Sequence, residues 1–218
     1  ESLIVVDESG QKREGTRRPF SELTLHLAAY AARPDVGAVI HAHPPFATAF
    51  AVAGVSLDPP FMPEAVVSLG PTIPTCDFAL PFGAAGAAPL KAHLPGCDAF
   101  LLANHGVIAI GPDLETAYLR LELVEHLAKI KHYAMALGGP KALSPEVLAP
   151  LLAKRTKAGL GPEARGLPPL SLPWVLAATS SQEPESAGVG PCSGAPMVTR
   201  EPAPGLLSSQ EALERLVA

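Results

Sequence analysis

The sequence has few cysteines, no long run of charge of one sign and no long uncharged apolar segment. Its three cysteines, Cys76, Cys97 and Cys192, are odd in number and widely spaced, which excludes a disulfide framework and a Cys-x-x-Cys zinc knuckle. This cysteine usage fits a reducing, cytoplasmic compartment. The 16 basic and 21 acidic residues form no single-sign block, so there is no electrostatic footprint for nucleic acid or an anionic membrane. We expect a small-molecule substrate.

The sequence also shows neither a secretory leader nor a transmembrane segment. No basic stretch followed by an apolar core opens the chain, and no uncharged stretch approaches the roughly 20 apolar residues of a membrane span. We therefore predict a protein that is neither secreted nor membrane-bound. The chain opens on Glu1 and has a strand-like apolar run already at 2–6, so we expect that an N-terminal part of the fold is missing.

Composition divides the chain into a globular part and a tail. The 218 residues are 48% hydrophobic, which is enough to bury a sizeable core. After about residue 140 proline and glycine become frequent, and residues 180–204 are rich in Ser, Pro, Gly and Glu. We predict a domain at 1–140 and a largely disordered C-terminal extension at 141–218, within which 210–217 can form a short helix.

Apolar periodicity and turn residues predict alternating strands and helices within the first domain. Ser21 is the expected N-cap of the first helix, and Asp113 is the expected N-cap of the longest one. The tripeptide at 104–106 has the composition of a tight turn between two apolar runs, which predicts a β-hairpin. The expected strands are 3–6, 38–43, 65–70, 99–103 and 107–110, and the expected helices are 21–33, 46–53, 84–94 and 113–137.

Two histidines lie where an apolar strand ends. His41 and His43 are separated by one residue, so on a strand both imidazoles point to the same face. Pro44-Pro45 follows at once and prevents the strand from continuing. The pair could simply cap a strand, but a third ligand would favour a metal ion, and His105 in the predicted turn can supply it. Three histidines suit a catalytic Zn²⁺ that keeps its fourth position open.

A carboxylate at the start of the first helix completes the candidate site. Glu22 is a candidate general base, because proton removal beside a metal-bound carbonyl needs a positioned carboxylate. The zinc ion would polarise that carbonyl as a Lewis acid. The alternative for Glu22 is an ordinary acidic residue favoured by the helix dipole. His26, one turn later, is expected beside the site rather than among the ligands.

Several segments, in their order and spacing, resemble the class II aldolase/adducin family. The segments that carry the resemblance are Pro19–Glu22, Ala28–Pro34, Val39–His43, Asn104–Val107 and Gly111–Glu125. The resemblance covers about the first 140 residues. It implies an α/β fold, namely a three-layer α/β/α sandwich around a mostly antiparallel central sheet. It also implies a homotetramer with active sites at subunit interfaces.

The resemblance further implies a zinc-dependent aldolase. Such a lyase cleaves or forms a carbon–carbon bond in a small sugar phosphate such as L-fuculose 1-phosphate, through a zinc-stabilised enediolate. Zinc would be held by His41, His43 and His105, Glu22 would be the catalytic acid/base, and Ser21 would bind substrate. Alternatives are a zinc epimerase, dehydratase or decarboxylase of the same fold acting on another phosphosugar or a hydroxy-acid, and a non-catalytic adducin-like protein. The retained histidines and glutamate argue against the last.

Two positions depart from the aldolase pattern. Phe20 stands where the family carries a hydroxyl-bearing residue before the glutamate. Residues 61–64 contain no tyrosine, whereas the aldolase donates one to the neighbouring site. Both departures bear on which sugar phosphate the chain recognises.

Overall fold

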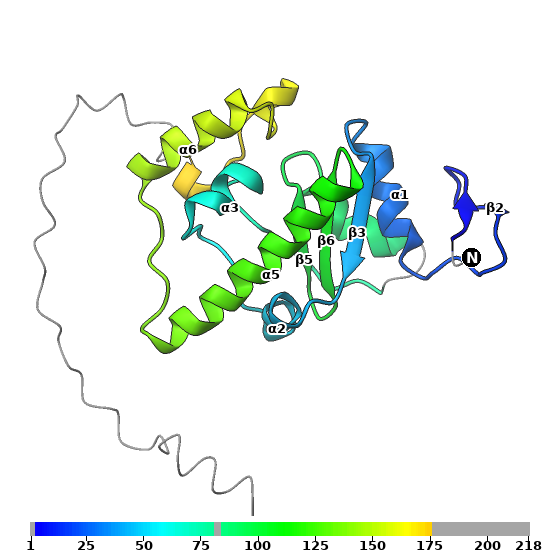
Figure 1. Cartoon of the computed structure of the whole chain (residues 1–218), viewed down its shortest axis with the longest axis horizontal. Helices are drawn as coiled ribbons and strands as arrows, with labels where there is room; N and C mark the ends of the chain where they lie inside the picture. The colour runs from blue at the N-terminus through cyan, green and yellow to red at the C-terminus, as the bar shows by residue number, and fades with distance from the viewer. Residues whose placement is uncertain (1–2, 81–83, 176–218) are drawn as a thin grey trace, which may run out of the picture. The chain divides into compact units, whose positions relative to one another are not determined.

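The computed structural model describes residues 3–80 and 84–175, and at its centre lies a four-stranded sheet (Figure 1). The strands in spatial order are β3 (Ala38–Ala42), β6 (Gly106–Gly111), β5 (Ala99–Leu102) and β4 (Thr75–Cys76). β6 pairs antiparallel with both β3 and β5, whereas β4 pairs parallel with β5, so the sheet is mixed. A separate hairpin near the N-terminus joins β1 (Val5–Val6) to β2 (Lys12–Glu14).

The side chains of the central strands alternate between two buried apolar clusters, one on each face of the sheet. From β5 and β6, the first cluster receives Phe100, Leu102, Ile108 and Ile110, and the second receives Ala99, Leu101, Val107 and Ala109. This alternation follows from the two-residue period of a strand. Because both faces of the sheet are buried, β5 and β6 are continuous apolar runs in the sequence. Their antiparallel pairing confirms the predicted hairpin.

Helices cover both faces. The first face carries α1 (Leu23–Ala32), the 3₁₀ turn η1 (Ala84–Ala87) and α4 (Ala88–Lys91). The second face carries α2 (Pro45–Ala53) and α5 (Leu114–Ala136), and Figure 1 shows α5 crossing the sheet there. The end of β3 and the β5–β6 turn therefore lie at one end of the sheet between the two helical layers.

Most helix limits follow from residues that are recognisable in the sequence. Asp113 accepts a hydrogen bond from the Thr116 backbone N–H at 2.7 Å and begins α5, as predicted. Gly54 has a left-handed φ of 65° and ends α2, also as predicted. Ser21 is not the N-cap of α1, because Glu22 occupies that position and no side chain caps the helix. The Ser21 hydroxyl instead donates to the Glu22 carboxylate.

The predicted strand at 65–70 is wrong, because residues 65–68 belong to helix α3 (Pro63–Ser68) and Leu69 is its C-cap. Pro63 occupies the first helical turn, where its missing N–H is not needed. Val66 is fully buried and shares a small apolar cluster with Leu148. A six-residue apolar run does not distinguish a buried strand from a buried helix, so packing decided the outcome. The helix predicted at 84–94 is confined to η1 and α4.

The segment 141–175 is ordered, which contradicts the predicted extension from residue 141. It contains α6 (Pro145–Lys157) and the 3₁₀ turn η2 (Glu163–Arg165). Leu148 is fully buried, and the Arg155 guanidinium donates to the Asp98 carboxylate at 2.7 Å beside the central sheet. The prediction failed because it counted prolines, whereas Pro145 occupies a helix start, where proline is favoured.

The predicted boundary at residue 140 therefore does not separate a domain from a tail. The described residues, 3–80 and 84–175, all belong to one compact unit, and residues 183–218 lie outside the described part of the chain. The predicted disorder at 180–204 and the predicted helix at 210–217 also lie outside the described residues.

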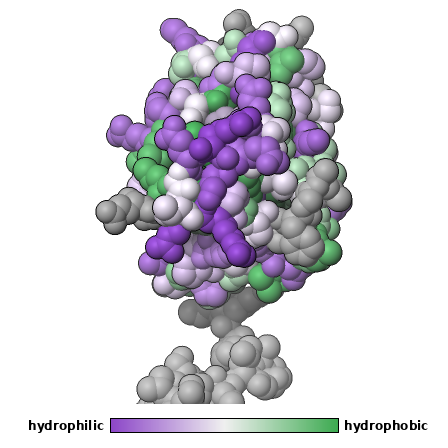
Figure 2. All heavy atoms as spheres, turned by 90° about the vertical axis from the view of Figure 1, so that its right-hand side faces the viewer, coloured by the Kyte–Doolittle hydropathy of each residue, from purple (hydrophilic) through white to green (hydrophobic). Residues whose placement is uncertain are grey.

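The described surface has a hydrophilic side. The face that carries the β1–β2 hairpin is dominated by hydrophilic side chains (Figure 2), and residues 11–21 are exposed throughout. Among residues 3–80 and 84–175, no helix is both long enough and apolar enough to cross a bilayer.

Candidate active site

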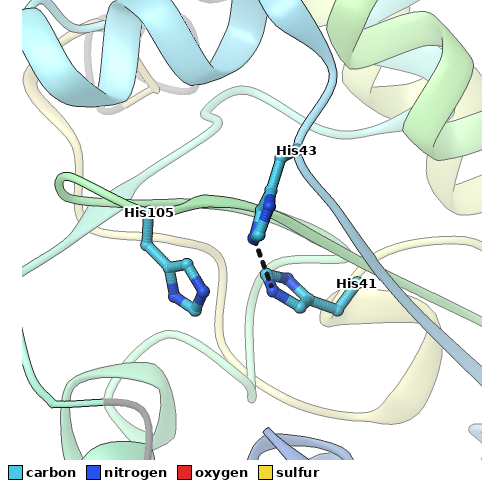
Figure 3. Close-up of side chains that lie close together, drawn as sticks. All are labelled: His41, His43 and His105. Carbon is cyan, nitrogen blue, oxygen red and sulfur yellow. Dashed lines mark hydrogen bonds between the residues drawn. The ribbon is translucent and has the colours of Figure 1, made fainter.

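Three histidines meet at one end of the central sheet. His41 lies on β3, His43 directly follows this strand, and His105 lies in the turn between β5 and β6. The pairing of Ala42 with Val107 places that turn beside the end of β3. Figure 3 shows the rings of His41 and His43 pointing toward each other, with the His105 ring beside them. The structure thus brings together the three predicted ligands.

The geometry of the three imidazoles fits a metal ion. One nitrogen of each ring lies within 4.8 Å of the others, and the Nε2 atoms of His41 and His43 are 3.1 Å apart. Tetrahedral zinc with Zn–N bonds of about 2.0–2.1 Å requires ligand nitrogens about 3.3 Å apart. Small movements of the His105 ring would complete such a set. Three imidazoles also leave a fourth position open for substrate.

The surroundings favour the neutral, metal-binding form of the rings. The Nδ1 atom of His41 lies 2.9 Å from the Val107 carbonyl oxygen, which accepts a hydrogen bond from Nδ1–H and leaves Nε2 with a free lone pair. Burial lowers the pKa of His41, although this hydrogen bond opposes the shift. Burial also lowers the pKa of His105, and the neighbouring His43 adds to the effect. Neutral imidazole is the form that binds a metal.

The turn that carries His105 depends on the backbone conformation of Asn104 and on the missing side chain of Gly106. Asn104 has a positive φ of 55°, a conformation that asparagine tolerates better than most residues. A Cβ atom on Gly106 would lie 2.5 Å from the His43 ring and 2.6 Å from the Ala42 carbonyl oxygen. Gly106 therefore allows the turn to pack directly against the histidine pair.

Glu22 lies beside the histidines. Its carboxylate oxygen Oε1 is 3.9 Å from Nε2 of His105, and its Oε2 accepts a hydrogen bond of 2.6 Å from the Ser21 hydroxyl. This hydrogen bond lowers the pKa of Glu22, and partial burial opposes the shift. Glu22 is therefore ionised at neutral pH and can accept a proton.

His26 lies near the cluster but is not part of it. Its ring packs edge-on against Phe20, with ring centroids 5.1 Å apart. Burial lowers the pKa of His26 to about 4, and His41 adds to the shift, so the ring is neutral. These contacts agree with its predicted place beside the site. Phe20 itself is 48% exposed and adds an apolar surface two residues before Glu22.

One residue that supports the site was not foreseen from the sequence. The Glu125 carboxylate of α5 accepts hydrogen bonds from the backbone N–H groups of Phe46 and Ala47, at 3.0 and 2.8 Å. Pro44 at the N-cap has no side-chain acceptor, so Glu125 caps α2 from another helix. Because α2 begins two residues after His43, this contact also holds that histidine. No local pattern signals a cap supplied 79 residues later.

Replacing Glu125 with alanine is expected to lower the free energy of unfolding by about 1–2 kcal/mol, because two backbone donors lose their acceptor. The variant is also expected to bind zinc more weakly, since the chain after His43 is less constrained. Denaturant titration and zinc titration measure the two effects. Glu122→Ala on the exposed side of the same helix is the matched control and should change neither. Equal stability of both variants would contradict the role of Glu125.

Comparisons with a family model and with individual relatives lead to the same family. The family model described as "Class II Aldolase and Adducin N-terminal domain" matches residues 1–132. An L-fuculose phosphate aldolase of Methanococcus vannielii is 34% identical over 138 residues, which are 62% of this chain and 72% of the relative. A 5-deoxy-D-ribulose 1-phosphate aldolase of Bacillus thuringiensis serovar kurstaki is 34% identical over 159 residues, 71% of each chain.

Comparison with solved structures leads to the same kind of protein. An L-fuculose 1-phosphate aldolase superposes with a TM-score of 0.64 at 33% identity, covering 69% of this chain and 70% of that chain. The chain belongs to the class II aldolase and adducin family, as the sequence resemblance indicated. Its similarity to aldolases within this family identifies an enzyme of the aldolase type, a lyase acting on carbon–carbon bonds.

Proposed function

We propose that the chain is a zinc-dependent aldolase that cleaves or forms a carbon–carbon bond in a small sugar phosphate such as L-fuculose 1-phosphate. The observation that carries this proposal is the convergence of three imidazoles with a carboxylate 3.9 Å from one of them. We assign His41, His43 and His105 as the zinc ligands and Glu22 as the acid/base. Ser21 is assigned to substrate binding.

The residues of the site have different roles in the proposed reaction. When bound, zinc supplies Lewis-acid polarisation of the substrate oxygens. In the direction of bond formation, the Glu22 carboxylate removes a proton from the carbon next to the carbonyl of the donor ketone. The electron pair left on that carbon attacks the aldehyde and forms the new carbon–carbon bond. The aldehyde oxygen takes a proton from solvent and becomes the new hydroxyl, and protonated Glu22 releases its proton to solvent. In cleavage, the hydroxyl loses its proton to solvent, the carbon–carbon bond breaks, and protonated Glu22 donates a proton to the donor carbon. The Ser21 hydroxyl orients the carboxylate.

The names of the relatives support a ketose 1-phosphate as substrate. L-fuculose phosphate and 5-deoxy-D-ribulose 1-phosphate are the substrates named for the two curated relatives. Cleavage of a ketose 1-phosphate between its third and fourth carbons gives dihydroxyacetone phosphate and an aldehyde. The two sugars differ only in the aldehyde part, so we propose that the donor half, dihydroxyacetone phosphate, is the common element recognised here.

We also propose a cytoplasmic homotetramer and, for the fold, a three-layer α/β/α sandwich with a mostly antiparallel central sheet. Antiparallel pairing of β6 on both sides and helices on both faces support this architecture. Large apolar side chains on α5 are exposed and offer a surface for contact between subunits; they are Leu114, Tyr118, Leu119, Tyr133 and Met135.

The zinc-loaded full chain is expected to release dihydroxyacetone phosphate from L-fuculose 1-phosphate, from 5-deoxy-D-ribulose 1-phosphate or from both. A coupled dehydrogenase assay with NADH measures the release. The double variant His41→Ala/His43→Ala serves as the inactive control. Release from neither sugar, together with epimerisation, dehydration or decarboxylation of another phosphosugar or a hydroxy-acid, would replace the aldolase proposal with the corresponding alternative.

A further inference from the structure

Four arginines gather at the end of the central sheet opposite to the histidines. β3 begins and β6 ends there, where Ala38 pairs with Gly111, whereas His41 and the β5–β6 turn lie at the other end of the same strands. A cavity of about 200 Å³ opens at this place. Its charged lining consists of Arg33, Asp35, Asp98, Arg120 and Arg165. This arginine cavity is therefore separate from the candidate active site.

Buried positive charge at this end exceeds buried negative charge. Asp98, only 1% exposed, pairs with three guanidinium groups. The N···O distances are 3.0 Å to Arg33, 3.2 Å to Arg120 and 2.7 Å to Arg155. Within the described residues, Arg120 and Arg155 form no other ion pair within 4.0 Å. One carboxylate therefore serves three buried arginines.

Asp35 only partly corrects this balance. Its carboxylate accepts two hydrogen bonds of 2.7 Å from Arg33, while Arg165 stays 3.9 Å away. Four arginines thus share two carboxylates. The nearby Asp113 is exposed, and its carboxylate already accepts the N-cap hydrogen bond of α5. Buried charges are costly unless they are paired, so an additional negative charge would stabilise this group of arginines.

Hydrogen-bond donors also remain free at the cavity. Arg33 has used its donors on Asp35, Asp98 and two backbone carbonyls. Arg120 donates to the Ile110 carbonyl and faces Asp98, so part of its guanidinium is unused. Arg165 donates to the Pro95 carbonyl, and its Nε is buried and has no partner among the described residues. Arg120 and Arg165 thus both line the cavity, and neither guanidinium group has all of its N–H donors paired within the described residues.

Burial and the neighbouring positive charges also disfavour the protonated form of Arg120 and of Arg165. Burial lowers the pKa of both Arg120 and Arg165. Asp98 opposes the shift at each residue, whereas the neighbouring arginines add to it. A bound anion would relieve this repulsion. Guanidinium groups suit oxyanions in particular, because their planar N–H groups match the geometry of phosphate and carboxylate oxygens.

We propose that the arginine cavity binds a phosphate-like oxyanion between Arg120 and Arg165. The volume of about 200 Å³ suffices, since a water molecule takes up about 30 Å³ of liquid. The ligand is either free inorganic phosphate or sulfate, or the phosphate group of a small metabolite. Arg165 belongs to η2, whereas Arg120 belongs to α5, so the anion joins the C-terminal part of the compact unit to the helix that covers the sheet.

Titration of the full chain with inorganic phosphate and with sulfate, at ionic strength kept constant with chloride, tests the proposal. Calorimetry is expected to show saturable binding of both oxyanions. Arg165→Gln should weaken it by roughly tenfold, because one charge-assisted partner is lost. Asp35→Asn should strengthen it, because a competing negative charge is removed. Arg13→Gln on the exposed β1–β2 hairpin is the matched control and should leave the affinity unchanged.

The outcomes separate this cavity from the candidate active site. Binding that is lost in Ser21→Ala but kept in Arg165→Gln would assign the anion to the active site and overturn the proposal. Absence of saturable binding, or an equal loss in Arg13→Gln, would also overturn it. A phosphate monoester such as glycerol 3-phosphate distinguishes the source, since tighter binding of the ester than of inorganic phosphate identifies a metabolite as the ligand.

Discussion

Replacing Glu22 with glutamine is expected to slow proton exchange between dihydroxyacetone phosphate and solvent by about 10²–10⁴-fold, the usual contribution of a general base. Glutamine keeps the size of the side chain and can still receive a hydrogen bond from Ser21, but it does not accept the substrate proton. Zinc content should stay unchanged, because the Glu22 carboxylate lies 3.9 Å from the His105 nitrogen and outside the set of three imidazoles.

Loss of the proton signal in deuterium oxide, followed by NMR, measures this exchange without the complete aldol reaction. The matched control is Glu64→Gln, since Glu64 is an exposed acidic residue in the first turn of α3. With the control variant, dihydroxyacetone phosphate should exchange its proton at the same rate as with the unmodified chain. If Glu22→Gln also exchanges at that rate, Glu22 is only an acid favoured by the start of a helix, and another group must move the proton.

The double variant His41→Ala/His43→Ala is expected to reduce zinc from about one ion per chain to a small fraction of that value. The reason is that a single remaining imidazole, that of His105, does not hold the metal against dialysis, whereas catalytic zinc sites use three protein ligands. Elemental analysis after dialysis with a weak chelator measures the content. The fold should persist, since His43 is exposed and His41 gives up one hydrogen bond worth about 1 kcal/mol.

A pair of exposed histidines on α5 provides the control. His126→Ala/His132→Ala removes the same number of imidazoles from the surface and should leave the zinc content unchanged. Zinc that remains at about one ion per chain in His41→Ala/His43→Ala would remove these residues from the metal site. Circular dichroism of both double variants separates loss of metal from loss of fold.

Local patterns in the sequence predicted much of the fold around the site. The β5–β6 hairpin was predictable because its strands are continuous apolar runs and because the residues between them, Asn104, His105 and Gly106, have the composition of a tight turn; Asn104 has the positive φ that such a turn needs. The start of α5 at Asp113 and the end of α2 at Gly54 were predictable for the same reason, since each depends on a neighbouring backbone group. Such features involve interactions over a few residues, and the residue types record them directly.

By itself the sequence determined which side chains are available to the site and which of them share a face. His41 and His43 point the same way because a strand repeats every two residues. The pairing of β6 with β3, which brings the turn at His105 to the end of β3, was decided by the tertiary structure. Only the tertiary structure decided that 65–70 turns into a helix, that 141–175 packs on the domain and that Glu125 caps α2. It also decided that Arg33 meets Asp98 across 65 residues. The physical reason is that these contacts join side chains far apart in the chain, where burial and pairing depend on the assembled core and no local spacing records them.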